Sequence, residues 1–143
     1  MSAGYLVDTN VISESMRPAP HAGVLEWLRT QLPLRLASVT VYELSRGVQL
    51  APAGRRRRFL DEWLNALLGG PAEIVPFEKD AAIAAAAIES SARRRGRPVA
   101  QRDLFILATA SAHGLSVATR DTRDFLGHGV PLFDPFRNIH QRG

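Results

Sequence analysis

Four acidic side chains occupy positions where a purely structural residue would be unexpected: Asp8, Glu43, Asp103 and Asp121. Asp8 and Asp121 each follow a short apolar run that predicts a strand, and ligands bind at the carboxyl ends of strands in open α/β sheets. Glu43 and Asp103 share faces of predicted helices with small or apolar residues, whereas a solvated acid would face the other way. Taken singly, each acid has a structural alternative. Asp8 could be a helix N-cap, and Asp121 could be an ordinary turn residue. Glu43 could be a boundary residue of its helix, and Asp103 an anion that the helix dipole favours.

Convergence of these acids in one pocket would predict a bound cation. Carboxylates that share a site repel one another, and some of their pKa values rise unless a positive charge neutralises them. The chain has no cysteine, and none of its histidines lies close to these acids in sequence. An all-oxygen set of ligands suits a hard cation, so we expect Mg²⁺, with Mn²⁺ as a substitute.

Short strands that alternate with helices are the elements that must position these acids. Apolar runs predict strands that end at Val7, Ala37, Phe77 and Ala118, and a peripheral fifth strand over residues 130–133. The fold class is therefore α/β, with a central, mostly parallel, four- to five-stranded sheet flanked by helices. We expect a single domain over residues 1–143, whose last few residues form a loose tail.

Composition narrows the cellular setting. The 143-residue chain is 45% hydrophobic and 22% charged, has no cysteine and carries a net charge of +4. These values are ordinary for a globular domain and fit a reducing cytoplasm. The sequence shows no secretory signal and no apolar run that could span a bilayer, so we expect a cytoplasmic protein without membrane contact.

The basic excess is almost entirely arginine, and its one local concentration is Arg55, Arg56, Arg57 and Arg58. These residues begin a predicted helix, where cations oppose the helix dipole. A phosphate-binding or partner-binding role would explain that cost, whereas a solvated arginine patch is the simpler alternative and the one we favour. Phe59 and Trp63 lie on the apolar stripe of the same helix, which predicts core packing rather than base stacking.

Four segments resemble, in order and at family-like spacing, the motifs of PIN-domain ribonucleases. They are LVDTNVISE at residues 6–14, SVTVYELSRG at 38–47, the helix containing Asp103 after GRPV at 96–99, and ATRDTRDF at 118–125. The chain is most similar to the VapC/FitB-like toxins of bacterial toxin–antitoxin pairs, and the resemblance covers nearly the whole sequence. Leu104 and Phe105 depart from the small residue that often follows the third acid in that family.

The resemblance implies a single PIN domain that acts as a metal-dependent endoribonuclease. The residues it marks as catalytic are Asp8, Glu43, Asp103 and Asp121. Those expected to bind the metal directly are Asp8, Asp103 and Asp121, while Glu43 would bind it through water or help to deprotonate the nucleophile. Residues expected to orient ligands or water are Thr9, Asn10, Thr119 and Asp124, and Asp124 is also an alternative to Asp121 as the fourth acid.

The family also implies partners. They are a small cognate antitoxin that occludes the acidic pocket, an RNA substrate, DNA reached only through the antitoxin, and a second copy of the chain in a homodimer or higher heteromer. One alternative is a catalytically weak or inactive PIN-like module that acts mainly through an antitoxin–DNA complex. The other is a different Mg²⁺-dependent phosphohydrolase, although haloacid-dehalogenase-type phosphatases usually carry an aspartate where this chain has Asn10.

Overall fold

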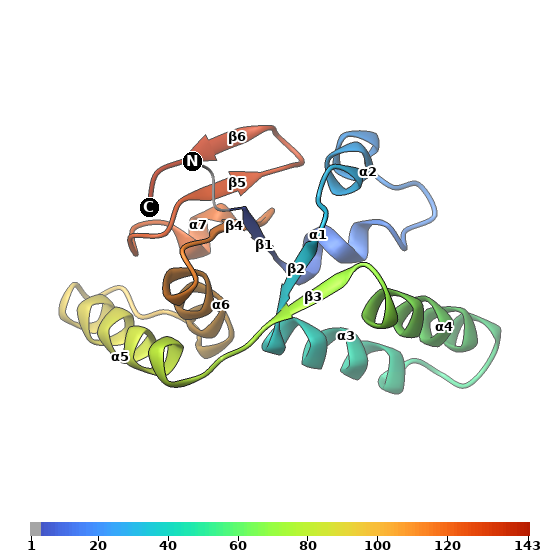
Figure 1. Ribbon diagram of the computed structural model, residues 1–143, viewed down its shortest axis with the longest axis horizontal. Coiled ribbons are helices and arrows are strands. Elements are labelled where there is room, and N and C mark those ends of the chain that lie inside the picture. The colour runs from blue at the N-terminus through green and yellow to red at the C-terminus, as the bar shows by residue number, and fades with distance from the viewer. Residues whose placement is uncertain (1–3) are drawn as a thin grey trace.

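Strands and helices alternate along the chain as the sequence predicts (Figure 1). The computed structural model describes residues 4–143. In chain order its elements are β1 (Tyr5–Val7), α1 (Thr9–Glu14), α2 (Ala22–Arg29), β2 (Leu34–Ala37), α3 (Ser38–Leu50), α4 (Arg55–Gly69), β3 (Ala72–Val75), α5 (Lys79–Arg94), α6 (Gln101–Ala112), β4 (Ser116–Ala118), α7 (Thr122–Phe125), β5 (Leu132–Asp134) and β6 (Ile139–Gln141). The third strand ends at Val75, two residues before the predicted Phe77.

The described strands form one six-stranded sheet in the order β3-β2-β1-β4-β5-β6. Strands β1 to β5 are parallel, and β6 runs antiparallel to β5. The chain adds β2 and β3 on one side of β1 and then returns to add β4 and β5 on the other side. The direction of winding therefore switches between β1 and β4, which lie next to each other in the middle of the sheet.

The C-terminal end differs from the predicted loose tail. Residues 139–141 pair with β5, and the ring of His140 stacks on Phe133 with the ring centroids 4.3 Å apart. Asn138, with a φ of 57°, adopts the left-handed conformation that turns the chain back toward β5. The prediction of a tail was wrong for these residues because β5 offers a free edge to pair with, which residue polarity does not reveal.

Helices cover both faces of the sheet (Figure 1). Successive side chains of a strand point to opposite faces, so neighbouring residues of β1 join different cores. Leu6 packs with Ile106 of α6 on one face, where α5 lies outside α6. Val7 packs with Val11 and Leu44 on the other face, which α1 to α4 cover. No helix within residues 4–143 combines the length and the apolar character that crossing a membrane would require.

Three aromatic residues of the helices, Phe105, Trp63 and Phe59, differ in how far they are buried in the core. Phe105, which stands near the family's small position, packs against Phe77 with ring centroids 4.8 Å apart, and this contact accommodates it between α5 and α6. Trp63 packs partly against the core, as predicted. Phe59 is 48% exposed and lies beneath the guanidinium of Arg56, so its prediction as a core residue was wrong.

Candidate active site

The candidate site lies at the carboxyl ends of the two central strands. Asp8 directly follows β1, and Thr119 directly follows β4. The backbone N–H of Asp8 donates to the carbonyl oxygen of Ala118 at 2.9 Å, which holds the two strand ends side by side. Because the chain connections diverge in opposite directions from this point, these strand ends lie at the position where ligands bind in open α/β sheets.

Asp8 has an exposed fraction of 0% although it carries a carboxylate. Its Oδ1 accepts a hydrogen bond from the backbone N–H of Thr9 at 2.7 Å, which makes Asp8 the N-cap of α1. Its Oδ2 accepts one from the hydroxyl of Thr119, also at 2.7 Å. The capping and the functional interpretations of Asp8 are therefore compatible, because the oxygen that accepts the capping bond also pairs with a cation, the guanidinium of Arg102.

Arg102 joins three of the predicted acids. Its Nε donates to Oε2 of Glu43 at 2.8 Å, its Nη1 donates to Oδ1 of Asp103 at 2.8 Å, and its Nη2 donates to Oδ1 of Asp8. The hydroxyl of Thr9 holds the other oxygen of Glu43, with a distance of 2.7 Å to Oε1. Acids from the start of α1, from α3 and from α6 thus meet around one guanidinium, as their convergence in one pocket requires.

Sequence reasoning missed Arg102. It lies in the first turn of α6, directly before Asp103, where an arginine is ordinarily assigned to a solvated surface. The available signal was its unfavourable place at a helix N-terminus, where a cation opposes the dipole. Burial alone would lower the pKa of Arg102, but hydrogen bonds to Glu43 and Asp8 raise it above its ordinary value, so the guanidinium stays charged.

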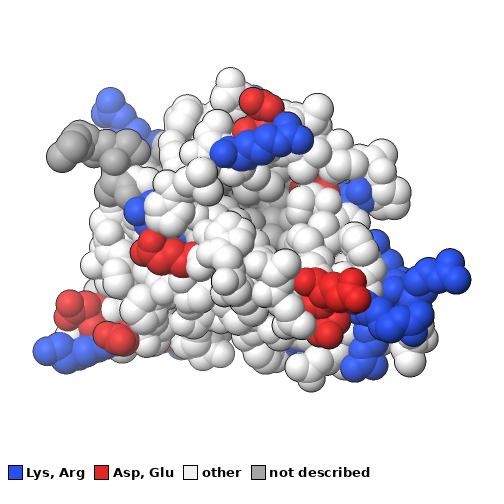
Figure 2. Space-filling model, turned by 45° about the vertical axis from the view of Figure 1, so that its right-hand side comes forward, with Lys and Arg blue, Asp and Glu red and all other residues white. Residues whose placement is uncertain are grey.

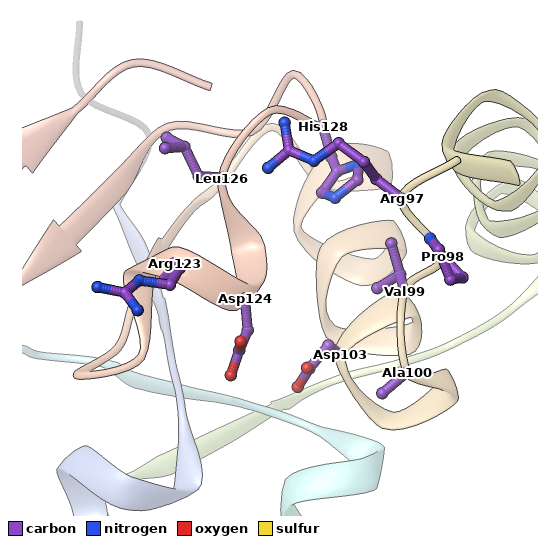
Figure 3. Close-up of a pocket in the computed structure, with 9 residues that line it drawn as sticks. All are labelled: Arg97, Pro98, Val99, Ala100, Asp103, Arg123, Asp124, Leu126 and His128. Carbon is purple, nitrogen blue, oxygen red and sulfur yellow. The ribbon is translucent and has the colours of Figure 1, made fainter. Parts of the chain in front are cut away.

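Asp103 lies between this cluster and an open cavity of about 360 Å³. Burial raises the pKa of Asp103, and the hydrogen bond from Arg102 opposes that shift. The side chains of Asp103 and Asp124 lie near each other at the lower end of the cavity, with Arg123 beside Asp124, whereas Arg97 and His128 lie at its upper end (Figure 3). The acids of the cavity are therefore at the end next to the cluster, and basic side chains line both ends.

Asp121 borders the cluster on the side of Asp8. Its Oδ2 accepts from the side-chain amide of Asn10 at 3.0 Å, and its backbone N–H donates to the hydroxyl of Thr119 at 3.1 Å. Asp124 lies within α7 and borders the cluster on the side of Asp103. The structure thus brings both candidates for the fourth acid to the rim of the site.

A second cavity, of about 340 Å³ and largely apolar, opens beside Glu43 between α1, α3 and α4. Leu44, Leu60 and Trp63 are among its apolar lining residues. Gly47 adds open space, since no atom lies within 4 Å of the position that a Cβ would take there. Gly47 and Glu43 therefore border the same groove.

The four arginines at positions 55–58 lie outside this network of contacts. They form the first turn of α4, and Arg55, Arg56 and Arg58 are exposed. Figure 2 shows basic side chains gathered at one side of the molecule, and Figure 1 places the turn from α3 to α4 on that side. Arg56 donates to the carbonyl oxygen of Met16 at 3.0 Å. Their role in binding RNA stays a prediction.

The types of side chain at the site fit a metal ion, but their present arrangement does not hold one. Carboxylate and hydroxyl oxygens are the ligands that Mg²⁺ prefers, so the chemistry of Asp8, Glu43, Asp103 and Thr119 fits it. Within residues 4–143, however, no three histidine, cysteine or acidic side chains are arranged to hold a metal together. The guanidinium of Arg102 lies among the acids and occupies the oxygens that an ion would use.

Comparison with known proteins identifies the family. The PIN domain profile matches residues 5–127, and the chain belongs to the PIN-domain family. It is 40% identical to "Toxin FitB" of Neisseria gonorrhoeae, over 93% of this chain and 99% of that protein. It is 39% identical to "VapC ribonuclease Y4jK" of Sinorhizobium fredii, over 92% of this chain and 96% of that one. A chain in the solved structure of FitAB bound to an IR36 DNA fragment matches with a TM-score of 0.86 and 37% identity, over 96% of this chain and 99% of that chain.

The family and the α/β fold with a mostly parallel sheet, both expected from the sequence, are confirmed. The chemical roles of the individual acids stay predictions.

Proposed function

We propose that this chain is a metal-dependent endoribonuclease and the toxin of a toxin–antitoxin pair. The observation that carries the proposal is the convergence of Asp8, Glu43 and Asp103 on a single cation, Arg102, at the point where the sheet reverses its winding. The names of its relatives, a toxin and a ribonuclease, support the same activity.

An acid cluster can act on RNA only if a cation is present, because carboxylates and a phosphodiester repel each other. Bound Mg²⁺, with Mn²⁺ as a substitute, would reverse the local charge, orient the scissile phosphate and lower the pKa of a water molecule. Asp8 and Asp103 would hold the ion, with Asp121 or Asp124 as the fourth acid. Each is tied into the fold by the strand end or helix that bears it.

The neighbouring residues would keep these acids in position. Thr119 and Thr9 each donate a hydroxyl hydrogen bond of 2.7 Å, to Asp8 and Glu43, respectively. Asn10 restrains Asp121 through its amide. Glu43 retains 27% side-chain exposure, so its Oε2 could take a proton from the attacking water once Arg102 has moved away, or bind the ion through water.

The antitoxin would bind in the apolar groove beside Glu43. Leu44, Leu60 and Trp63 offer the apolar surface that an amphipathic helix of a partner covers, and the groove ends at an acid of the cluster. A partner seated there would therefore also restrict access to the site. By its likeness to FitAB on DNA, this chain would reach DNA only through the antitoxin, in a homodimer or a higher heteromer. The cytoplasm is where such a toxin meets its RNA.

The test is cleavage of a mixed pool of structured RNAs by the purified, antitoxin-free chain. Reactions with Mg²⁺, with Mn²⁺ and with EDTA are compared for the wild-type chain and for Asp8→Asn. Asp61→Asn makes the same chemical change on the exposed surface of α4 and serves as the matched control. We expect metal-dependent cleavage that Asp8→Asn abolishes and Asp61→Asn retains. Equal metal-dependent cleavage by wild type and Asp8→Asn would refute the assignment of the site.

The alternative is a weakly catalytic or inactive module that acts through an antitoxin–DNA complex. Arg102 favours it, because this residue already neutralises part of the cluster without a metal. Absence of cleavage together with absence of metal binding would support this second function.

A further inference from the structure

The acid cluster contains a cation that belongs to the chain itself. Arg102 donates to Asp8, Glu43 and Asp103 at once, and the network includes a carboxylate with no solvent exposure. We propose that Arg102 is the resident counter-ion of the cluster and that a divalent metal ion has to displace it, so that metal binding is coupled to release of this side chain. The inference rests on the proposed function, since it takes the cluster as the metal site.

The charges explain why a resident cation is needed. A buried carboxylate such as Asp8 destabilises a fold unless it is paired and hydrogen-bonded. Here three carboxylates face one guanidinium, so pairing with Arg102 leaves an excess of negative charge in the cluster. The cluster is therefore stable enough to fold without a metal, yet still attracts a second cation.

The atoms involved make the two cations exclusive. Arg102 uses Oδ1 of Asp8, Oδ1 of Asp103 and Oε2 of Glu43. The remaining oxygens of Asp8 and Glu43 already accept hydroxyl hydrogen bonds, from Thr119 and Thr9. Oδ2 of Asp103 accepts none of these bonds, but an ion that bridges Asp8 and Glu43 through the oxygens without a hydroxyl donor takes the oxygens that face the guanidinium. The positive charges of the two groups would also repel each other.

Arg102 has a route out of the cluster. Its side chain is 32% exposed and lies in the first turn of α6, so the guanidinium can swing into solvent without a change in the core. Ala100, at the N-cap of α6, offers no side-chain cap, and a cation in the first turn opposes the dipole. The acids are thus the only described groups that hold Arg102 inward, and a metal removes that attraction.

The experiment compares Mn²⁺ and Mg²⁺ affinity, measured by titration calorimetry, with stability, measured by urea unfolding in EDTA. The variant Arg102→Gln removes the charge and keeps most of the stem. Arg94→Gln removes one exposed arginine from α5 and is the matched control. Asp8→Asn in the Arg102→Gln background shows whether the ion binds at the cluster.

We expect two opposite changes in Arg102→Gln. Metal affinity increases by at least about tenfold to a hundredfold, which corresponds to one of the three charge-assisted hydrogen bonds that the ion no longer has to break. Stability in EDTA falls, because the cluster has lost its counter-ion. A purely structural role would lower stability and metal affinity together. Arg102→Lys keeps the charge but cannot bridge three carboxylates, so we expect an intermediate metal affinity.

Two results overturn the inference, and they are distinguishable. If Asp8-dependent metal binding has the same affinity in wild type, Arg102→Gln and Arg102→Lys, displacement is refuted while the proposed metal site stands. If neither the wild type nor either folded Arg102 variant binds metal, both the displacement and the proposed metal-dependent function fail. Should Arg102→Gln not fold, an unchanged affinity in Arg102→Lys alone refutes displacement.

Discussion

Three buried threonines allow the stabilisation by one hydrogen bond of the site to be compared with that by hydroxyl groups elsewhere in the fold. Thr119, Thr109 and Thr40 all have exposed fractions of 1% or less, and they differ in what their hydroxyl groups contact. Thr119 donates to the Asp8 carboxylate at 2.7 Å, and Thr109 donates to the carbonyl oxygen of Phe105 at 2.7 Å. Within the described chain, the Thr40 hydroxyl has no hydrogen-bond partner. Substitution by valine preserves shape and branching and removes only the hydroxyl.

The three substitutions should change stability by different amounts, and even in different directions. A hydrogen bond to a charged group contributes about 1.5–3 kcal/mol, so Thr119→Val should lower the free energy of unfolding by at least that amount, since the hydroxyl also accepts a bond from the backbone N–H of Asp121. For a domain of this size the corresponding loss in Tm is about 5–10 °C. Thr109→Val removes a neutral bond and should cost about 0.5–1.5 kcal/mol. Thr40→Val removes a buried, unpaired hydroxyl and should stabilise the protein by about 1 kcal/mol.

The assay is urea unfolding in EDTA, followed by circular dichroism, with thermal unfolding as a second measurement. EDTA ensures that the comparison reports on the fold and not on a bound ion. Equal destabilisation by Thr119→Val and Thr109→Val would refute the claim that the carboxylate makes the Thr119 bond special. Destabilisation by Thr40→Val would refute the claim that its hydroxyl is unpaired.

Three further predictions concern the groove, the cavity and the fourth acid. Gly47→Ala should stabilise α3 by about 0.5–1 kcal/mol, because there is open space for the methyl group, whereas Gly47→Gln should fill the groove and weaken antitoxin binding measured by calorimetry. Arg97→Gln should lower the salt slope of single-stranded RNA binding by about 0.7, the value for one phosphate contact, and Arg94→Gln, an exposed position of α5 away from the cavity, should leave the slope unchanged. Of Asp121→Asn and Asp124→Asn, the substitution that abolishes RNA cleavage identifies the fourth acid, and full activity of both would exclude a fourth acid from this pair.

Much of the fold could be predicted because its signals are local. Alternating apolar runs and helical periodicity locate most elements, and the same patterns expose Glu43 and Asp103 as acids on the wrong face. Arg102 could not be found in this way. Arg102 contacts Glu43, which is 59 residues away in sequence. That contact depends on the orientation of α6, which is determined by packing and not by the local sequence. The pairing of β6 likewise depends on the edge of β5 and not on the polar residues 139–141 themselves.

The site joins stability and function through the same atoms. The Asp8 carboxylate caps α1, accepts the Thr119 hydroxyl from the end of β4 and pairs with Arg102 of α6, so it connects both central strands to one covering helix. A carboxylate in that position would ordinarily oppose folding, because its burial is costly without a counter-charge. Since Arg102 provides the counter-charge, the chain can assemble its acids before any metal binds. The same arrangement neutralises part of the charge of the acids without a metal. Under the proposed displacement, access of an ion, and with it the proposed nuclease activity, depends on whether Arg102 faces inward or outward.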